Sequence, residues 1–138
     1  MTDTYAMNTT EPTPEINRPD VLAQVNAAFD AYEQALVTND VAVLDALFFD
    51  SPHTLRYGAT ENLYGYDAIR EFRASRPSAG LARSVTARVV TTYGDAFAVA
   101  NIEFQRDGDP RIGRQSQTWV KTAGGWRVVA AHVSLMRG

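Results

Sequence analysis

The stretch TLRYG, residues 54–58, places an arginine between two apolar residues, Leu55 and Tyr57. In a strand, alternation puts Leu55 and Tyr57 on one face and Arg56 on the other. A guanidinium matches a carboxylate through two parallel hydrogen bonds and stays charged at any working pH. Two structural roles compete with this one, a solvated strand face and an ion pair. If Arg56 faces a cavity, it could hold a carboxylate.

A second candidate is Tyr32, which follows Phe29 by about one turn on the apolar stripe of an expected helix. Its hydroxyl could donate or accept a proton if it points into a cavity. The competing interpretation is a core tyrosine whose hydroxyl bonds to a carbonyl. Three arginines further along could supply a second anion contact or simply pair with neighbouring acids. They are Arg70, Arg73 and Arg76.

Polar side chains on the expected strands of the second half are further candidates. Alternation groups them with large apolar residues, which fits a tapering pocket with a polar mouth and equally fits a wet subunit interface. Among them, His132 is the imidazole best placed to act as an acid or base, since His53 follows a proline at a loop end. The candidate substrate-binding residues are Gln117, His132, Tyr64, Asn101 and Gln115.

Composition excludes several function classes. The chain has 138 residues, a net charge of −3 and no cysteine. The lack of cysteine removes disulfides and thiol nucleophiles and fits a reducing cytoplasm, where we expect the protein to work. The sequence has no basic run for a nucleic-acid surface and no apolar run long enough to span a membrane. Two histidines far apart do not make a metal site, so we expect neither metal nor cofactor.

Residues 1–18 are rich in Thr, Pro and Glu and are expected to form a flexible tail. Residues 19–138 are expected to form a single domain. Asn17 can cap a first helix, which runs on through Tyr32. Two further helices are expected over residues 40–50 and 65–77.

The second half of the sequence changes to the alternating period of strands. Four long strands are expected, over residues 83–93, 96–106, 111–122 and 126–136, and glycine-bearing turns join them into an antiparallel meander. Strands of this length twist and curve. We therefore expect an α+β fold: a cone made by a curved antiparallel sheet with three helices on its concave face, enclosing a pocket.

The outer face of the sheet has no helix to cover it in this arrangement. Alternation along the last strand places Val129, Ala131, Val133 and Leu135 on that face. An apolar face left open in this way should be buried by another subunit. We therefore expect a homodimer or a higher even oligomer.

The order of helices and strands resembles the nuclear transport factor 2-like superfamily, specifically its SnoaL-like members. The ending GGWRVVAAHVSLM looks like the last strand of that group. A narrower match is the segment FFDSPHTLRYGATENLYGYDAIREFRASRP. It closely resembles a bacterial subfamily named after oxalurate catabolism, in which an RYG strand precedes a similar segment. The resemblance covers roughly residues 20–137.

The similar sequences include an enzyme of cyanuric acid breakdown that removes a carboxyl group from 1,3-dicarboxyurea to give allophanate. The resemblance thus implies a small-molecule substrate, a ureide that carries carboxylates. With the residue chemistry, it suggests that Arg56 binds and orients this substrate while Tyr32 delivers the proton. The predicted function is a cofactor-independent decarboxylating amidohydrolase. The alternative is a non-catalytic module that binds a ligand or a partner enzyme in a ureide pathway.

Overall fold

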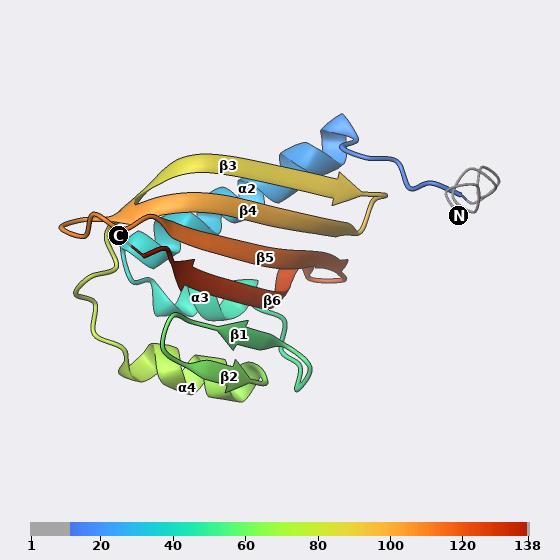
Figure 1. Ribbon diagram of the computed structural model, residues 1–138. Coiled ribbons are helices and arrows are strands. Elements are labelled where there is room, and N and C mark those ends of the chain that lie inside the picture. The colour runs from blue at the N-terminus through green and yellow to red at the C-terminus, as the bar shows by residue number, and fades with distance from the viewer. Residues whose placement is uncertain (1–11, 138) are drawn as a thin grey trace, which may run out of the picture.

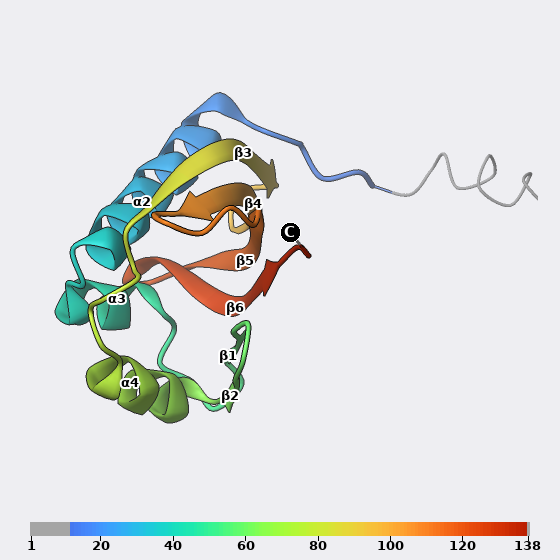
Figure 2. The same cartoon turned by 60° about the vertical axis from the view of Figure 1, so that its left-hand side comes forward.

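The structure is a computed structural model that describes residues 12–137. Three helices lie against one side of a curved sheet, which confirms the α+β cone (Figure 1, Figure 2). The helices are α2 (Pro19–Val37), α3 (Val41–Leu47) and α4 (Tyr66–Ser75). The strands are β1 (Leu55–Tyr57), β2 (Asn62–Tyr64), β3 (Arg83–Tyr93), β4 (Phe97–Arg106), β5 (Gly113–Thr122) and β6 (Gly125–Leu135).

The sheet has the strand order β2-β1-β6-β5-β4-β3. The four long strands form the expected antiparallel meander. The short strand β1 joins the edge of β6 in parallel, with Arg56 opposite Ala131, so the sheet is mixed. Strand β2, which the sequence analysis did not predict, pairs antiparallel with β1 and places Leu63 opposite Arg56. The pairing with β6 therefore fixes Arg56 at the concave face.

The hydrophobic core fills the concave face where α2 crosses the sheet. Val21, Val25 and Phe29 of α2 are each no more than 2% exposed, and Trp119 of β5 and Val128 of β6 are fully buried. The three helix residues recur every four positions and Tyr32 follows three positions later, which gives a continuous apolar stripe. Burial of each large side chain contributes about 1.5–3 kcal/mol. This packed region anchors the helix that carries Tyr32.

The folded unit begins earlier than the sequence suggested. Asn17 does not cap α2; it adopts a φ of 58° and bonds to the end of β3. Its N–H donates to the Thr92 carbonyl at 3.0 Å, and its Oδ1 accepts from the Thr92 N–H at 2.9 Å. Gly94 N–H donates to the Glu15 carbonyl at 2.8 Å. Residues 15–17 are therefore docked on the sheet, while residues 1–11 of the expected tail lie outside the described residues.

A bulge in β6 overturns the predicted faces of the last strand. Thr118 pairs with Ala130 but Trp119 pairs with Val128, so Val129 is an extra residue in the ladder. An extra residue reverses the alternation beyond it. Ala131 and Val133, predicted to face outward, are each 5% exposed and belong to the core, and Leu135 packs against it. His132 correspondingly points outward.

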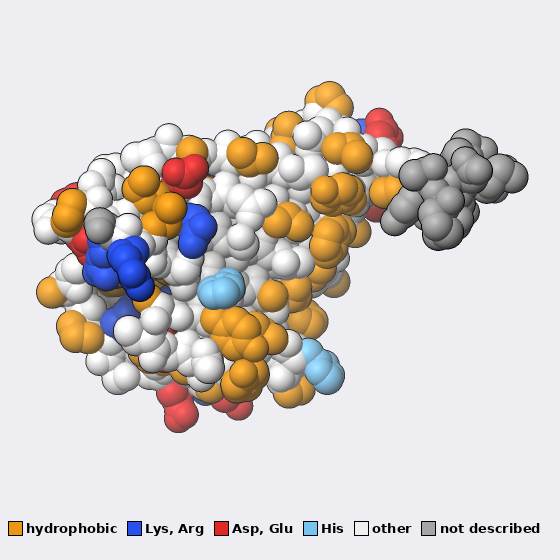
Figure 3. Space-filling view, viewed as in Figure 1, with side chains coloured by type: hydrophobic (Ala, Val, Ile, Leu, Met, Phe, Trp, Pro, Cys, Tyr) orange, Lys and Arg blue, Asp and Glu red, His pale blue; other side chains and the backbone are white. Residues whose placement is uncertain are grey.

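The apolar residues that the outer face does expose come from other positions. They are Tyr64, Val89, Tyr93 and Phe97, all more than one third exposed. Figure 3, which views the sheet from the side without helices, shows hydrophobic side chains spread over this face. Assembly through it stays a prediction, now resting on these residues. Within residues 12–137, no helix has the length and apolar character needed to cross a membrane.

Candidate functional site

A cavity opens at the end of the cone where the β1–β2 hairpin, the end of α4 and the ends of β4 and β6 meet. Its volume is about 600 Å³. A narrow inner chamber of about 30 Å³ continues from it toward α2 and adds Tyr32, Arg83 and Gln115 to the lining. The outer cavity is lined by Arg56, Gly58, Ala59, Thr60, Glu61, Phe72, Arg76, Leu81, Arg106, Arg111, His132, Val133, Ser134 and Leu135.

Arg56 projects from β1 into this cavity and also lines the inner chamber. Its Nη1 donates to Glu61 Oε2 at 2.8 Å, and its side chain is 13% exposed. The guanidinium lies 5.6 Å from the centre of the Phe72 ring. A guanidinium has five N–H donors, and Glu61 engages one nitrogen, so donors remain for a ligand.

The carboxylate of Glu61 is held from two sides. Burial raises its pKa, but hydrogen bonds from Thr60 and Arg56 outweigh burial, so the pKa lies below its ordinary value. Thr60 Oγ1 donates to Glu61 Oε1 at 2.7 Å. Gly58 leaves the space that this carboxylate occupies, because a Cβ at that position would collide with it. The glycine of the RYG motif therefore lets Glu61 reach Arg56.

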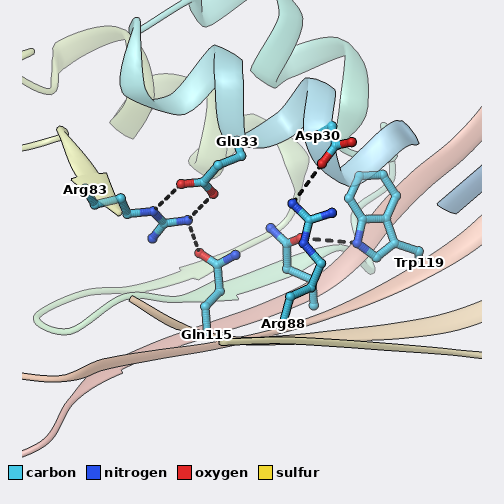
Figure 4. A network of polar contacts seen from close by, with 7 residues as sticks. Asp30, Glu33, Arg83, Arg88, Gln115 and Trp119 are labelled. Carbon is cyan, nitrogen blue, oxygen red and sulfur yellow. Dashed lines mark hydrogen bonds and ion pairs between the residues drawn. The ribbon is translucent and has the colours of Figure 1, made fainter. Parts of the chain in front are cut away.

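Arg83 lines the inner chamber and connects α2 to the sheet through polar contacts (Figure 4). Its Nε and Nη2 donate to the two carboxylate oxygens of Glu33 at 2.9 and 2.8 Å. Nη2 also donates to Gln115 Oε1 at 3.2 Å, and the guanidinium lies 4.3 Å from the centre of the Phe104 ring. With a side chain only 4% exposed and a bidentate partner, Arg83 is neutralised and fixed in place.

Two further arginines face the cavity without an acidic partner among residues 12–137. Arg76 follows α4, and its Nε and Nη2 are buried without a hydrogen-bond partner. Burial, followed by the nearby charge of Arg56, lowers the pKa of Arg76. Burial, followed by the charge of Arg83, lowers the pKa of Arg106. Both stay protonated, as arginines do, so the cavity carries an excess of positive charge.

Tyr32 lies at the junction of the core and the inner chamber. It is 4% exposed, with its ring centroid 6.2 Å from that of Phe29 and 6.3 Å from that of Phe48. It lines the same chamber as Arg56 and Arg76. Among the described residues its hydroxyl has no hydrogen-bond partner, which leaves the hydroxyl available to a ligand. The helix stripe that predicts a core tyrosine thus also delivers Tyr32 to the chamber wall.

The two glutamines of β5 point to the concave face, as alternation predicts. Gln115 is 2% exposed and lines the inner chamber, where its Nε2 has no partner. Gln117 is 1% exposed and lies deeper, where its Oε1 accepts from Trp119 Nε1 at 3.1 Å. It borders neither chamber. The structure therefore places Gln115 at the candidate site and Gln117 in the layer beneath it.

Three other predicted binding residues lie on the outer face. The His132 ring packs edge-on against Tyr57 at 5.5 Å between centroids, although the His132 position borders the cavity rim. Tyr64 is 64% exposed, and its hydroxyl lies 3.3 Å from that of Tyr57. The exposed Asn101 accepts from Ser116 Oγ at 2.6 Å. The predicted place of Asn101 and Tyr64 at the pocket is wrong, because neither residue borders the cavity or the inner chamber. The bulge turns the ring of His132 outward but leaves this residue at the cavity rim, so its part in substrate binding stays a prediction.

The sequence did not indicate several charged residues of the cavity, among them Arg83 and Arg106. Each stands at one end of a long strand, and the two are direct cross-strand partners. Like charges placed opposite each other destabilise a sheet. The sequence does show an arginine at one end of each of two adjacent strands. That the two arginines lie opposite each other is known only once the register between β3 and β4 is known. Within residues 12–137, no group of three or more His, Cys, Asp or Glu is arranged to hold a metal ion.

The geometry can be compared with known proteins. A crystal structure of a protein of unknown function from the DUF3225 family of Pectobacterium atrosepticum is 61% identical, with a TM-score of 0.87, covering 88% of this chain and 95% of that one. A cystatin-like fold protein from Burkholderia xenovorans is 46% identical, with a TM-score of 0.87, covering 91% of this chain and 98% of that one. No curated protein matches.

More distant matches show the fold alone. A nuclear transport factor 2-like superfamily protein from Salmonella enterica is 24% identical, with a TM-score of 0.72, over 86% of this chain and 93% of that one. The cone with its curved sheet is therefore the NTF2-like, or cystatin-like, fold. A sequence model of the AtzH-like family matches residues 14–138, which include every residue of the cavity. The chain belongs to the AtzH-like family.

Proposed function

We propose that this protein is a cofactor-independent decarboxylating amidohydrolase that acts on a small carboxylated urea. The observation that carries the proposal is the inner chamber, which is lined by Tyr32 and Arg56 together with Arg76 and Arg106. One potential proton donor thus stands among fixed cations in a narrow space. That combination suits a small anionic substrate that must take up a proton.

The substrate class follows from the charge and size of the site. Carboxylates are the ligands that guanidinium groups bind with two-point geometry. The outer cavity of about 600 Å³ has room for a small substrate, whereas the inner chamber of about 30 Å³ has room for about one water-sized group. At that chamber, Gln115 Nε2 can donate to a carbonyl. A flat apolar ring would leave these buried donors unsatisfied, which costs free energy. The resemblance to enzymes of ureide breakdown favours 1,3-dicarboxyurea, with allophanate as the product.

In the proposed reaction, Arg56 holds one carboxylate and so fixes the orientation of the urea. The bond between the other carboxyl carbon and its nitrogen breaks, carbon dioxide leaves, and the electron pair stays on the nitrogen. Tyr32 donates its hydroxyl proton to that nitrogen and recovers a proton from water. A positioned acid of this kind contributes about 10²–10⁴-fold, and orientation adds to it.

The test is turnover of 1,3-dicarboxyurea by the purified chain, followed as carbon dioxide and allophanate. We expect turnover without added metal or cofactor, and a strong loss in Tyr32→Phe, which keeps the ring and removes only the hydroxyl. Tight binding of the substrate without turnover would contradict the proposal. That outcome would support the alternative, a binding or accessory module of a ureide pathway.

A further inference from the structure

The charges of the cavity do not balance, and the imbalance is local. Arg56 and Arg83 each have a carboxylate partner, Glu61 and Glu33. Arg76 and Arg106 have none among residues 12–137. Each lines both the outer cavity and the inner chamber. Two fixed cations that face the same small space are therefore not neutralised by the described part of the chain.

The backbone holds Arg76 in this position. The residue directly follows α4 as its C-cap, with a φ of −74° and a ψ of 133°, the extended geometry that the following Pro77 favours. Its guanidinium has two buried nitrogen atoms without a partner. A buried donor without a partner costs free energy, and buried polar groups in proteins are almost always satisfied. The fold holds Arg76 in an arrangement that is unfavourable until an acceptor arrives.

Arg106 is held in an equally unfavourable place. It stands directly opposite Arg83 in the β3–β4 ladder, and like charges in that relation repel. Glu33 already occupies Arg83 with a bidentate pair, so Arg83 cannot serve as the second anion contact. Arg106 lies 5.7 Å from the centre of the Phe104 ring, which supports the guanidinium without neutralising it. An anion between Arg76 and Arg106 would give Arg76 an acceptor and offset the repulsion between Arg106 and Arg83.

We propose that Arg76 and Arg106 form a second carboxylate subsite, so that the cavity selects dianions with a carboxylate at each end over monoanions of the same length. One carboxylate binds Arg56, and the other binds the Arg76–Arg106 pair. Arg76 and Arg106 are specificity-determining residues in this scheme. The inference rests on the proposed function for the identity of the site, but it concerns binding and needs no catalysis.

The probe is glutarate, whose two carboxylates are separated by three atoms, as in a dicarboxylated urea. Its monoamide has the same length and one charge fewer. We expect calorimetric titration of the full chain to show that glutarate binds at least about tenfold more tightly than the monoamide, the size of one charge-assisted contact. Arg76→Gln and Arg106→Gln should each reduce this preference to about twofold or less, mainly by weakening glutarate binding.

Three controls make the result decisive. Arg70→Gln removes a charge from the exposed side of α4 and should keep the full preference. Arg76→Lys should keep part of the preference for glutarate over the monoamide. The ligand-free Arg76→Gln protein should melt no earlier than the wild type, because it loses an unpartnered buried cation rather than a structural contact. A lower melting temperature together with an unchanged preference would show a structural role and overturn the proposal.

The remaining outcomes separate this inference from the proposed function. If Arg56→Lys weakens both probes while Arg76→Gln preserves the preference for glutarate, the second subsite is wrong and the Arg56 clamp stands. If neither variant changes binding, the cavity is not the anion site and both proposals fail. If the wild type binds glutarate no better than the monoamide, or binds neither, the dianion subsite is overturned.

Discussion

The two ends of the concave face are built by the same strands and differ in what the side chains do there. At the closed end, Trp119 and Val128 of the sheet pack against Val25 and Phe29 of α2 without exposure. At the open end, the same alternation presents Arg106 and Gln115 to a cavity. The closed end contributes stability. The open end accepts unpaired charge that stability alone would not favour, which supports the proposal that this end binds the substrate.

The largest effect is expected at Tyr32, where the closed and open ends meet, and it tests whether the two ends differ in role. We expect Tyr32→Phe to lower kcat by about 10²–10⁴-fold, because the proposed proton donor is lost. Stability should change by about 1 kcal/mol or less, since the ring volume is kept. Steady-state kinetics and thermal melting of the same preparation measure both. Normal kcat with reduced stability would assign Tyr32 to the closed end alone.

At the closed end, Trp119→Ala should reverse that pattern. We expect a loss of about 3–5 kcal/mol in the free energy of unfolding, because a fully buried indole is replaced by a cavity. The molecules that remain folded should keep most of their activity. Urea unfolding, with turnover normalised to the folded fraction, checks this. A large drop in kcat per folded molecule would show that the two ends are coupled.

Arg56→Lys tests the clamp at the open end. The ammonium keeps the charge but loses the planar two-point contact, so we expect kcat/KM to fall by about 10–100-fold. The matched control is Arg88→Lys, whose guanidinium pairs with Asp30 away from the cavity and should leave kcat/KM unchanged. Equal behaviour of the two variants would contradict the assignment of Arg56.

Glu61 should give the open end a pH-dependent stability. Its pKa in the folded protein lies below the ordinary value of 4.5. A carboxyl group whose pKa is lowered by folding stabilises the fold at pH values above its ordinary pKa. This contribution is lost as the pH falls through the pKa of the folded protein. Glu61→Gln should therefore destabilise the protein at neutral pH and less in acid. Urea unfolding at both pH values tests this, and a constant difference would contradict the role of the Arg56–Glu61 pair.

The smallest effect is expected at His132, on the outer face. His132→Ala should leave kcat/KM within about twofold and the free energy of unfolding within about 0.5 kcal/mol, since the ring is exposed and contacts Tyr57 only at an edge. Steady-state kinetics of this variant with the same substrate would show whether the outer face of the sheet differs from the concave face in its effect on kcat/KM. A strong kinetic effect would mean that the outer face takes part in the reaction.

The sequence predicted much of the fold because the periodic patterns of its apolar residues depend only on neighbouring positions. The helical stripe with Phe29 and Tyr32, and the alternation from Gln115 to Trp119, depend on neighbouring residues and appear in the structure as expected. The short strand β2 was missed, since three residues carry too little pattern. The face of His132 was wrong because a bulge at Val129 depends on pairing with β5, which no local period records.

The candidate site divides in the same way. By itself, the sequence determined that Arg56 faces the other side of its strand from Leu55 and Tyr57, because alternation of side chains follows from the pleat. Only the tertiary structure decided that Arg76, Arg83 and Arg106 meet around it. Residues from α4, β3 and β4 converge there because the sheet curves and its register places Arg83 opposite Arg106. Curvature and register arise from contacts between distant segments, so the charge of the cavity is a property of the fold.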